Sequence, residues 1–177
     1  MLTPITLLLL ILVAGAESYN QQLLSHTQTI ISSYASLTSR NLLDDRFPLI
    51  PKTANIEFIT KLIYESKDII LLSHNNSPQP IFNYANTAAQ KLFKFALSDM
   101  LRMESRKSAE TGTDQEERSE ILKKVSNQGF CDDYSGIRIN ALGERFMVRR
   151  ATVFNLSDQG DRYGQAAVFN LDDIEML

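Results

Sequence analysis

The chain has 177 residues, of which 44% are hydrophobic, and these values are typical of one folded domain rather than of a disordered chain. Its 18 basic and 21 acidic residues give a formal net charge of -3, so no overall basic field favours nucleic acid or an anionic membrane. A single cysteine, Cys131, excludes an intramolecular disulfide and a zinc site made of cysteines. The two histidines, His26 and His74, stand far apart at no metal-ligand spacing, and no metal site is expected.

The first 16 residues form an apolar segment that allows several interpretations. The run from Ile5 to Ala14 is too short for a bilayer, which needs about 20 apolar residues, so no membrane span is expected. Ala14-Gly15-Ala16 fits a signal-peptide cleavage site, but no Lys or Arg precedes the run. Three interpretations stay open: a cleaved signal peptide, an apolar arm packed on the domain, and a wrongly assigned start. A cytoplasmic location is slightly favoured, and a secreted or periplasmic one follows if the segment is cleaved.

Residues 17–66 are expected to form N-terminal helices. From Gln21 to Arg40 apolar residues recur at three-, four- and seven-residue intervals, which indicates one face of an amphipathic helix. These residues are Leu23, Leu24, Ile30, Ile31, Tyr34 and Leu37. Prolines between Arg46 and Pro51 interrupt the pattern, because proline lacks an amide donor. A second helix, expected to end near Ser66, carries Ile56, Ile59, Leu62 and Ile63 on one side.

The apolar face of the first helix needs a surface to pack on, because an isolated helix of about 20 residues is marginal in water. The sheet of the same chain is one candidate for that surface. The same face of a second copy is the other, and two-fold association is the commonest symmetric arrangement of soluble proteins. We therefore expect a homodimer whose contact includes the helix from Gln21 to Arg40.

Residues 67–177 are expected to form the core of the domain. A buried strand over residues 68–74 and a second strand over 80–84 are separated by turn-forming residues, which predicts a hairpin. Asn86 is well placed to cap a helix that begins at Thr87, because an Asn side chain can accept a bond from the first free amides of a helix.

The last part of the chain alternates like a sheet. A helix over residues 114–128 comes first and is expected to stop at Gly129. A slip in the later alternation, at Arg149-Arg150, indicates a bulge. The strands are expected over residues 130–140, 144–156 and 163–171. The predicted fold class is α+β: a five-stranded antiparallel sheet with inserted helices, preceded by N-terminal helices, a layout that resembles PAS domains.

Several short motifs, in order along about residues 20 to 170, resemble the MEKHLA domain family. Among them are Leu71-Leu-Ser-His74, Pro80-Ile-Phe-Asn-Tyr-Ala-Asn86, Tyr134-Ser-Gly-Ile-Arg-Ile139, Gly143-Glu-Arg-Phe146 and Ala151-Thr-Val-Phe-Asn-Leu156. The resemblance implies a PAS-like, non-catalytic regulatory module for small-molecule sensing, protein interaction or both. The chain departs from the family pattern at Phe154, where a Trp is usual.

A PAS-like fold places its ligand between the concave sheet and the inserted helices, so polar residues there are candidates for binding. Arginine is of special interest because its planar fork fits a carboxylate or phosphate. The candidate ligand-binding residues are Tyr84, Asn86, Arg106, Tyr134, Arg138 and Arg145. Structural alternatives stay open: a helix cap for Asn86, internal salt bridges for the arginines, and a bulge or close backbone approach at Gly136.

His74 and Cys131 are candidates for a proton or redox switch. Their structural alternatives are a hydrogen-bonding residue at a strand end and a small buried hydrophobic residue. Haem is disfavoured because His74 precedes the inserted helices, and covalent flavin is disfavoured because the Asn-Cys-Arg-Phe motif of flavin photoreceptors is absent. No motif of nucleophilic catalysis or phosphate binding occurs, so no enzyme is expected. The alternative is an enzyme on a cone-like α+β barrel that uses a pocket acid or His74.

Overall fold

The computed structural model describes residues 21–109, 112–158 and 160–177. The apolar segment 1–16, with its three open interpretations, lies outside these residues. The described chain begins with the expected N-terminal helices, and a short helix that was not expected lies between them. In chain order they are α2 (Gln21–Thr38), α3 (Leu42–Arg46) and α4 (Ile56–Tyr64).

A sheet with inserted helices follows. Strands β1 (Ile69–Asn75) and β2 (Phe82–Ala85) form the expected hairpin. The inserted segment contains α5 (Thr87–Phe93), α6 (Leu97–Met100), the 3-10 helix η1 (Ser105–Ser108) and α7 (Thr113–Gln128). The chain ends in β3 (Phe130–Ile139), β4 (Arg145–Asp158), β5 (Asp161–Asn170), the 3-10 helix η2 (Leu171–Asp173) and β6 (Ile174–Met176).

The described strands pair antiparallel in the spatial order β2-β1-β5-β4-β3. The prediction of five strands is wrong by one, because β6 pairs with β4 from Phe146 to Val148, before the stretch of β4 that pairs with β5. The predicted bulge is confirmed. Arg149 and Arg150 together oppose Ser135 of β3, and Arg150 has a positive φ of 52°.

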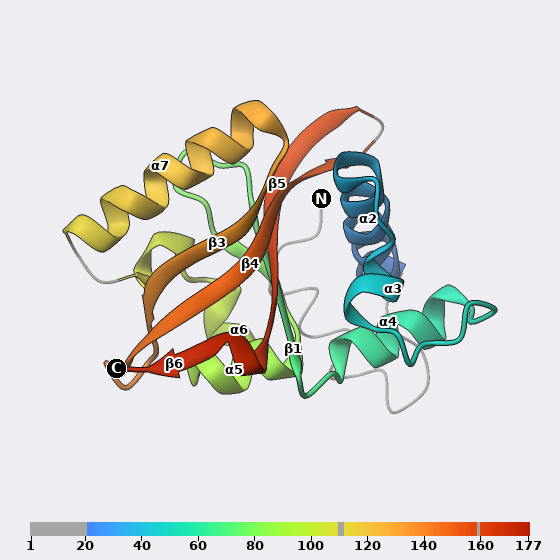
Figure 1. Ribbon diagram of the computed structural model, residues 1–177, viewed down its shortest axis with the longest axis horizontal. Helices are drawn as coiled ribbons and strands as arrows, with labels where there is room; N and C mark the ends of the chain where they lie inside the picture. The colour runs from blue at the N-terminus through green and yellow to red at the C-terminus, as the bar shows by residue number, and fades with distance from the viewer. Residues whose placement is uncertain (1–20, 110–111, 159) are drawn as a thin grey trace.

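Helices cover both faces of the sheet (Figure 1). Helices α2, α3 and α4 lie against one face, called here the outer face, and α5, α6 and α7 lie against the inner face. Alternation along β1 serves both layers, because successive side chains of a strand point to opposite faces. Leu71 joins the outer core with Ile30 and Tyr34 of α2, whereas Ile70 and Leu72 join the inner core.

The apolar face of α2 packs on the sheet of its own chain. Ile30 and Tyr34 are fully buried, and the Tyr34 ring meets the Phe154 ring of β4 edge to face, with centroids 5.3 Å apart. Of the two surfaces considered for this helix, the structure uses the sheet. The homodimer through Gln21 to Arg40 stays a prediction, but its original reason, an apolar face without a surface to cover it, no longer applies.

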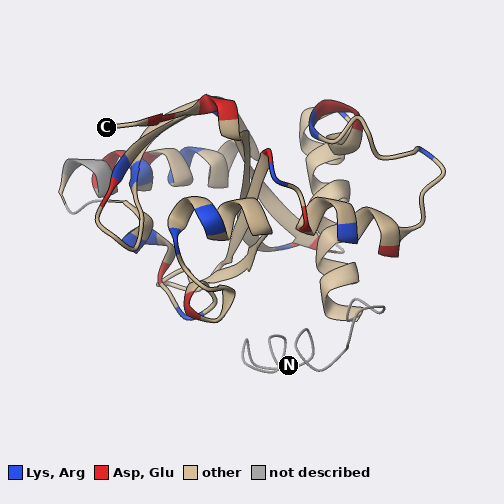
Figure 2. Cartoon of the chain, turned by 90° about the horizontal axis from the view of Figure 1, so that it is seen from below, with Lys and Arg blue, Asp and Glu red and all other residues tan. Residues whose placement is uncertain are grey.

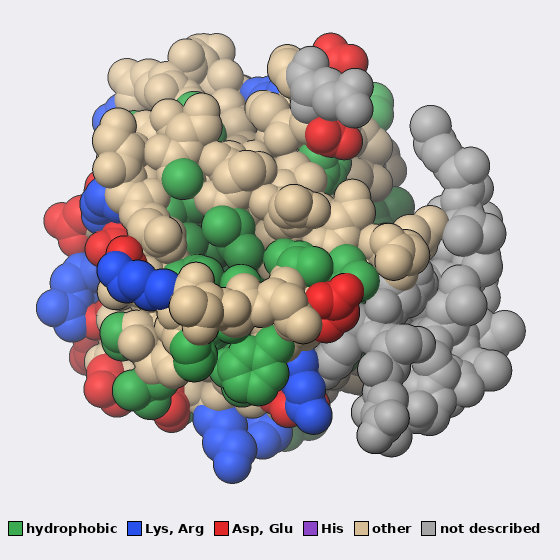
Figure 3. Space-filling model, turned by 90° about the vertical axis from the view of Figure 1, so that its right-hand side faces the viewer, with side chains coloured by type: hydrophobic (Ala, Val, Ile, Leu, Met, Phe, Trp, Pro, Cys, Tyr) green, Lys and Arg blue, Asp and Glu red, His purple; other side chains and the backbone are tan. Residues whose placement is uncertain are grey.

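Along the ribbon of the described chain, Lys and Arg positions are interspersed among Asp and Glu positions (Figure 2). Apolar side chains gather on the side covered by the N-terminal helices (Figure 3). The exposed large apolar residues of that helical region include Leu49, between α3 and α4, and Phe58 of α4. Within the described ranges, no helix has the length and hydropathy that a bilayer crossing requires.

Candidate functional site

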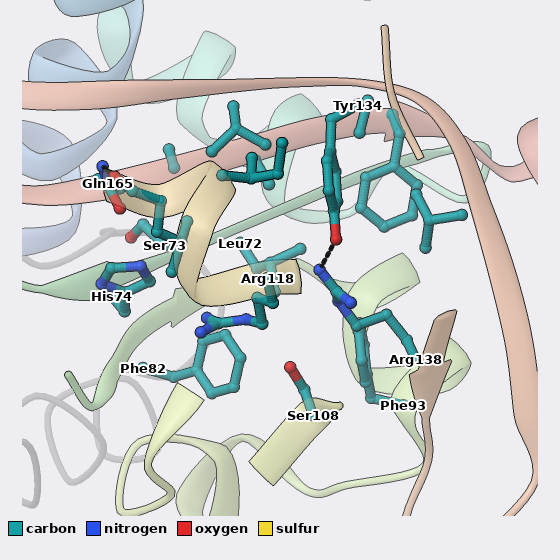
Figure 4. Close-up of a pocket in the computed structure, with 18 residues that line it drawn as sticks. Leu72, Ser73, His74, Phe82, Phe93, Ser108, Arg118, Tyr134, Arg138 and Gln165 are labelled. Carbon is teal, nitrogen blue, oxygen red and sulfur yellow. Dashed lines mark hydrogen bonds between the residues drawn. The ribbon is translucent and has the colours of Figure 1, made fainter. Parts of the chain in front are cut away.

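A cavity lies on the inner face, between the sheet and α7 (Figure 4). Its volume is about 60 Å³, room for a few water molecules or a ligand of a few non-hydrogen atoms. The apolar part of its wall includes Leu72, Phe82, Phe93, Ile121, Val148 and Phe169. The larger polar side chains at the wall are His74 of β1, Arg118 of α7, Tyr134 and Arg138 of β3, and Gln165 of β5.

Tyr134 and Arg138 form one rigid unit on β3. The Arg138 guanidinium donates through Nη2 to the Tyr134 hydroxyl and through Nη1 to the carbonyl of Ile137, 2.6 Å away. It also lies 5.3 Å from the centre of the Tyr134 ring, within range of a cation–π contact. Gly136 makes this arrangement possible, because a Cβ there would stand 2.2 Å from the Tyr134 hydroxyl. The close approach at Gly136 is thus made by side chains and not by the backbone, as had been considered.

Arg118 enters the cavity from α7. Its Nη2 donates to the Ser105 hydroxyl at 3.0 Å, which anchors the guanidinium to η1. Burial, together with the positive charge of Arg138, lowers the pKa of Arg118 to about 9, so the group still carries its charge at neutral pH. Among the ion pairs between described residues, none involves Arg118 or Arg138.

His74 presents one free ring nitrogen near these arginines. Its Nδ1 lies 2.9 Å from the carbonyl of Asn75, which can only accept, so Nδ1 carries the proton and Nε2 holds a lone pair. Nε2 is buried without a hydrogen-bond partner in the described structure. Burial lowers the pKa of His74 to about 4, and the positive charges of Arg118 and Arg162 act in the same direction. The ring is therefore neutral at pH 7.

The cavity adjoins a wider, open cleft of about 540 Å³. His74, Arg118, Leu122 and Gln165 line both spaces and so form the boundary between them. Figure 4 shows Arg118 between His74 and Arg138. A small molecule that enters from the cleft meets His74 and Arg118 before it reaches Arg138.

The structure brings three of the sequence-based candidates to the cavity: Tyr134, Arg138 and His74. Tyr84 instead belongs to the outer core, where its ring lies beside those of His26 and Tyr64. The prediction that the candidate residues gather in one site is therefore wrong for Tyr84, because it points to the opposite face of the sheet.

Asn86 is the predicted helix cap and does not line the cavity. Its Oδ1 accepts from the amide of Ala89, at the start of α5, and from that of Leu71. Its Nδ2 donates to the carbonyls of Ile63 and Ile69. All its bonding capacity serves to join α4, β1 and α5, so its assignment as a ligand-binding residue is corrected in favour of the structural alternative.

Two other arginines and the cysteine lie away from the cavity. Arg106 is exposed on the rim of the cleft and pairs with Glu104 at 2.6 Å, while Arg145 is exposed at the start of β4. Cys131 is only partly buried, so the expectation of a buried hydrophobic residue is wrong, and its Sγ lies 3.3 Å from the carbonyl of Asp132. Within the described part of the chain, no group of His, Cys, Asp and Glu is arranged to hold a metal ion.

Arg118 was not among the candidates, although the sequence contains a signal for it. Ile121, Leu122 and Val125 were expected to face inward from their helix, and Arg118 precedes them by three, four and seven residues. Those intervals place Arg118 on the same helical face. Arg118 follows two acidic residues, Glu116 and Glu117, and such a mixture of charges is typical of a solvated surface, which hides the signal.

An antiparallel sheet with helices inserted after its second strand defines a PAS-like α+β domain, and solved structures agree. A PAS domain from Colwellia psychrerythraea gives a TM-score of 0.55 at 11% identity, over 69% of this chain and 96% of that one. An RNA-binding light-oxygen-voltage receptor gives 0.58 at 17%, over 71% and 35%. A Rhodobacter sphaeroides LOV protein gives 0.51 at 13%, over 62% of each chain. At such identities these similarities establish the fold alone.

The MEKHLA domain model matches residues 24–172, which is most of the chain. The chain therefore belongs to the MEKHLA domain family. A comparison with curated proteins finds no match.

Proposed function

We propose that this domain is a regulatory sensor that binds a small anion in the cavity between the sheet and α7. The observation that carries the proposal is the pair of guanidinium groups, Arg118 and Arg138, at the wall of a largely apolar cavity. No ion pair between described residues involves either group. Arg138 is only 9% exposed. A buried charge without a counter-charge costs several kcal/mol, and a bound anion would remove much of that cost.

The two arginines come from separate layers, which connects binding to conformation. Arg138 belongs to the sheet and Arg118 to α7, and the positive charge of each disfavours the approach of the other. A carboxylate between them would replace this repulsion by charge-assisted hydrogen bonds to both. Binding would then favour the conformations in which α7 lies close to the sheet, and such a population shift is what a sensor needs.

The composition of the cavity also supports a sensor over an enzyme. Convergent acids and a histidine would favour an enzyme, whereas apolar walls with few polar anchors would favour a binding module. Among the lining residues that the structure describes there is one histidine and neither Asp nor Glu. The hydroxyl of Ser108, which also lines the cavity, donates to the carbonyl of Ser105 and not to a general base.

Thermal unfolding of the full chain in rising acetate tests the proposal, with chloride at equal ionic strength as the reference. We expect a saturable rise in Tm with acetate, because a ligand of the folded state stabilises it by mass action. Arg138→Gln should abolish this rise, while Arg145→Gln, the matched exposed arginine of the neighbouring strand, should preserve it. A Tm that follows ionic strength alone, or an Arg138→Gln variant that responds like the wild type, would refute the proposal.

A further inference from the structure

We infer that the ligand is a small hydroxycarboxylate, whose carboxylate binds Arg138 and Arg118 and whose hydroxyl donates a hydrogen bond to Nε2 of His74. This inference rests on the proposed function and names the ligand class of the same cavity. Its carrying observation is the buried lone pair of His74, beside the two arginines.

The role of His74 as an acceptor follows from its contacts. The Nδ1 proton is held by the carbonyl of Asn75, and this carbonyl belongs to the same β1 strand end. His74 is only 8% exposed, so water has little access to Nε2. A buried acceptor without a donor is rare in folded proteins and usually marks a ligand or an ordered water.

The charges around His74 select the kind of donor. An ammonium group would approach the two positive charges of Arg118 and Arg138, which disfavour it. A carboxylate alone, such as acetate, offers only acceptors and leaves Nε2 unmatched. A neutral hydroxyl satisfies His74 without adding charge, so the three side chains together match an acid that also carries an alcohol.

The apolar wall and the size of the cavity narrow the class further. Leu72, Phe82 and Ile121 line the same cavity, and carbon atoms of a ligand suit contacts with these side chains better than the oxygens of inorganic phosphate do. The volume of about 60 Å³ suits acids of a few non-hydrogen atoms. Glycolate is the smallest hydroxycarboxylate, and it differs from acetate by one hydroxyl group.

Titration calorimetry with glycolate and acetate, on the full wild-type chain, tests the inference. Sites that hydrogen-bond a ligand hydroxyl discriminate strongly against the analogue without it, so glycolate should bind roughly ten-fold more tightly or better. His74→Asn keeps a donor for the Asn75 carbonyl but has no group at the position of Nε2. This variant should bind acetate as the wild type does and lose the preference for glycolate, while His74→Gln should restore part of it.

His26→Asn is the matched control, because His26 is the other histidine of the chain and lies on the outer face. It should keep the glycolate preference. On the wild type, the ¹⁵N signal of His74 Nε2 should shift on addition of glycolate and stay in place with acetate. This measurement does not depend on whether any variant folds.

The outcomes separate the two proposals. Equal binding of acetate and glycolate, both lost in Arg138→Gln, would overturn the hydroxycarboxylate inference and leave the anion sensor standing. Inorganic phosphate that binds more tightly than glycolate would overturn the inference in the same way. No binding of any of the three anions would overturn the anion sensor itself and the inference with it.

Discussion

Tyr134 and Arg138 face the cavity on either side of Gly136, and their hydrogen bond spans the position where a side chain would stand. A methyl group there would press on the Tyr134 hydroxyl, so we expect Gly136→Ala to displace Arg138 from its place at the wall. Acetate binding should weaken about ten-fold, and overpacking should cost about 1–3 kcal/mol of stability. Calorimetry and thermal unfolding measure the two effects. Ser135→Ala, at the exposed neighbouring position, is the control and should leave acetate affinity unchanged. Unchanged acetate affinity in Gly136→Ala would show that Tyr134 and Arg138 do not hold the ligand.

Arg118 carries a charge that no described residue neutralises. Replacing it with a neutral side chain should therefore stabilise the ligand-free chain. Arg118→Met keeps much of the length and apolar surface of the side chain, and we expect a gain of about 1 kcal/mol in the free energy of unfolding. For a chain of this size that is a rise of about 2–4 °C in Tm. The same variant should lose the stabilisation by acetate. A marked fall in Tm would instead indicate that Arg118 is a structural residue.

The sequence predicted the residues of the site only in part, for identifiable physical reasons. Tyr134 and Arg138 could be predicted from their place on a strand beside an expected pocket. Arg145 could not be separated from them, because one-residue offsets between strands decide which face a side chain takes. Arg106 does lie near the cavity, on the rim of the adjoining cleft. Its partner Glu104 lies only two residues away and holds it at the surface.

At the scale of elements, His26 joins α2 to the sheet. The hydroxyl of Ser73 donates to Asn83, so it accepts from Nε2 of His26 at 2.9 Å. Ser73 and His74 point to opposite faces of β1. The helical layer on the outer face and the cavity on the inner face are therefore connected through adjacent residues of one strand.

The buried histidines predict a loss of stability in mild acid. Burial lowers the pKa of His26 to about 4, as it does for His74, so between about pH 6.5 and pH 4 the unfolded chain binds more protons than the folded one. Stability must then fall as pH falls, by on the order of 2 kcal/mol for each histidine at pH 5. Thermal unfolding from pH 7.5 to pH 5 measures this. His26→Asn should flatten the profile, and an equally steep profile in that variant would contradict the assignment.

Two short elements escaped sequence-based prediction because their stability comes from contacts outside themselves. Helix α3 has only five residues, and Asn41 caps it by accepting from the amide of Leu43. Strand β6 has three residues, and it exists because β4 extends beyond β5 and leaves a free edge. Neither segment is long enough to show a periodic pattern. The long elements, such as α2, α7 and β4, carry their own patterns and were predicted to within a few residues.

At the scale of the whole molecule, the order of elements was predictable because the period of the hydrophobic pattern changes where the chain passes from helices to strands. Which face of the sheet packs on the N-terminal helices and which face lines the cavity was not predictable. Either the sheet or a second copy of the chain could have covered the apolar face of α2, and the sheet covers it with an outer face of matching apolar character, where Phe154 and Val168 are fully buried. Only the assembled sheet shows which face remains for a ligand.

The proposed sensor binds a small anion on the inner face, beside Arg118 and Arg138. The most direct test is an isotope-filtered nuclear Overhauser experiment with ¹³C-labelled acetate and the full chain. We predict contacts from the acetate methyl group to the methyl groups of Leu72, Ile121 and Val148, which line the cavity. Contacts confined to residues of the outer face, such as Leu23 and Ile63, would contradict the claim.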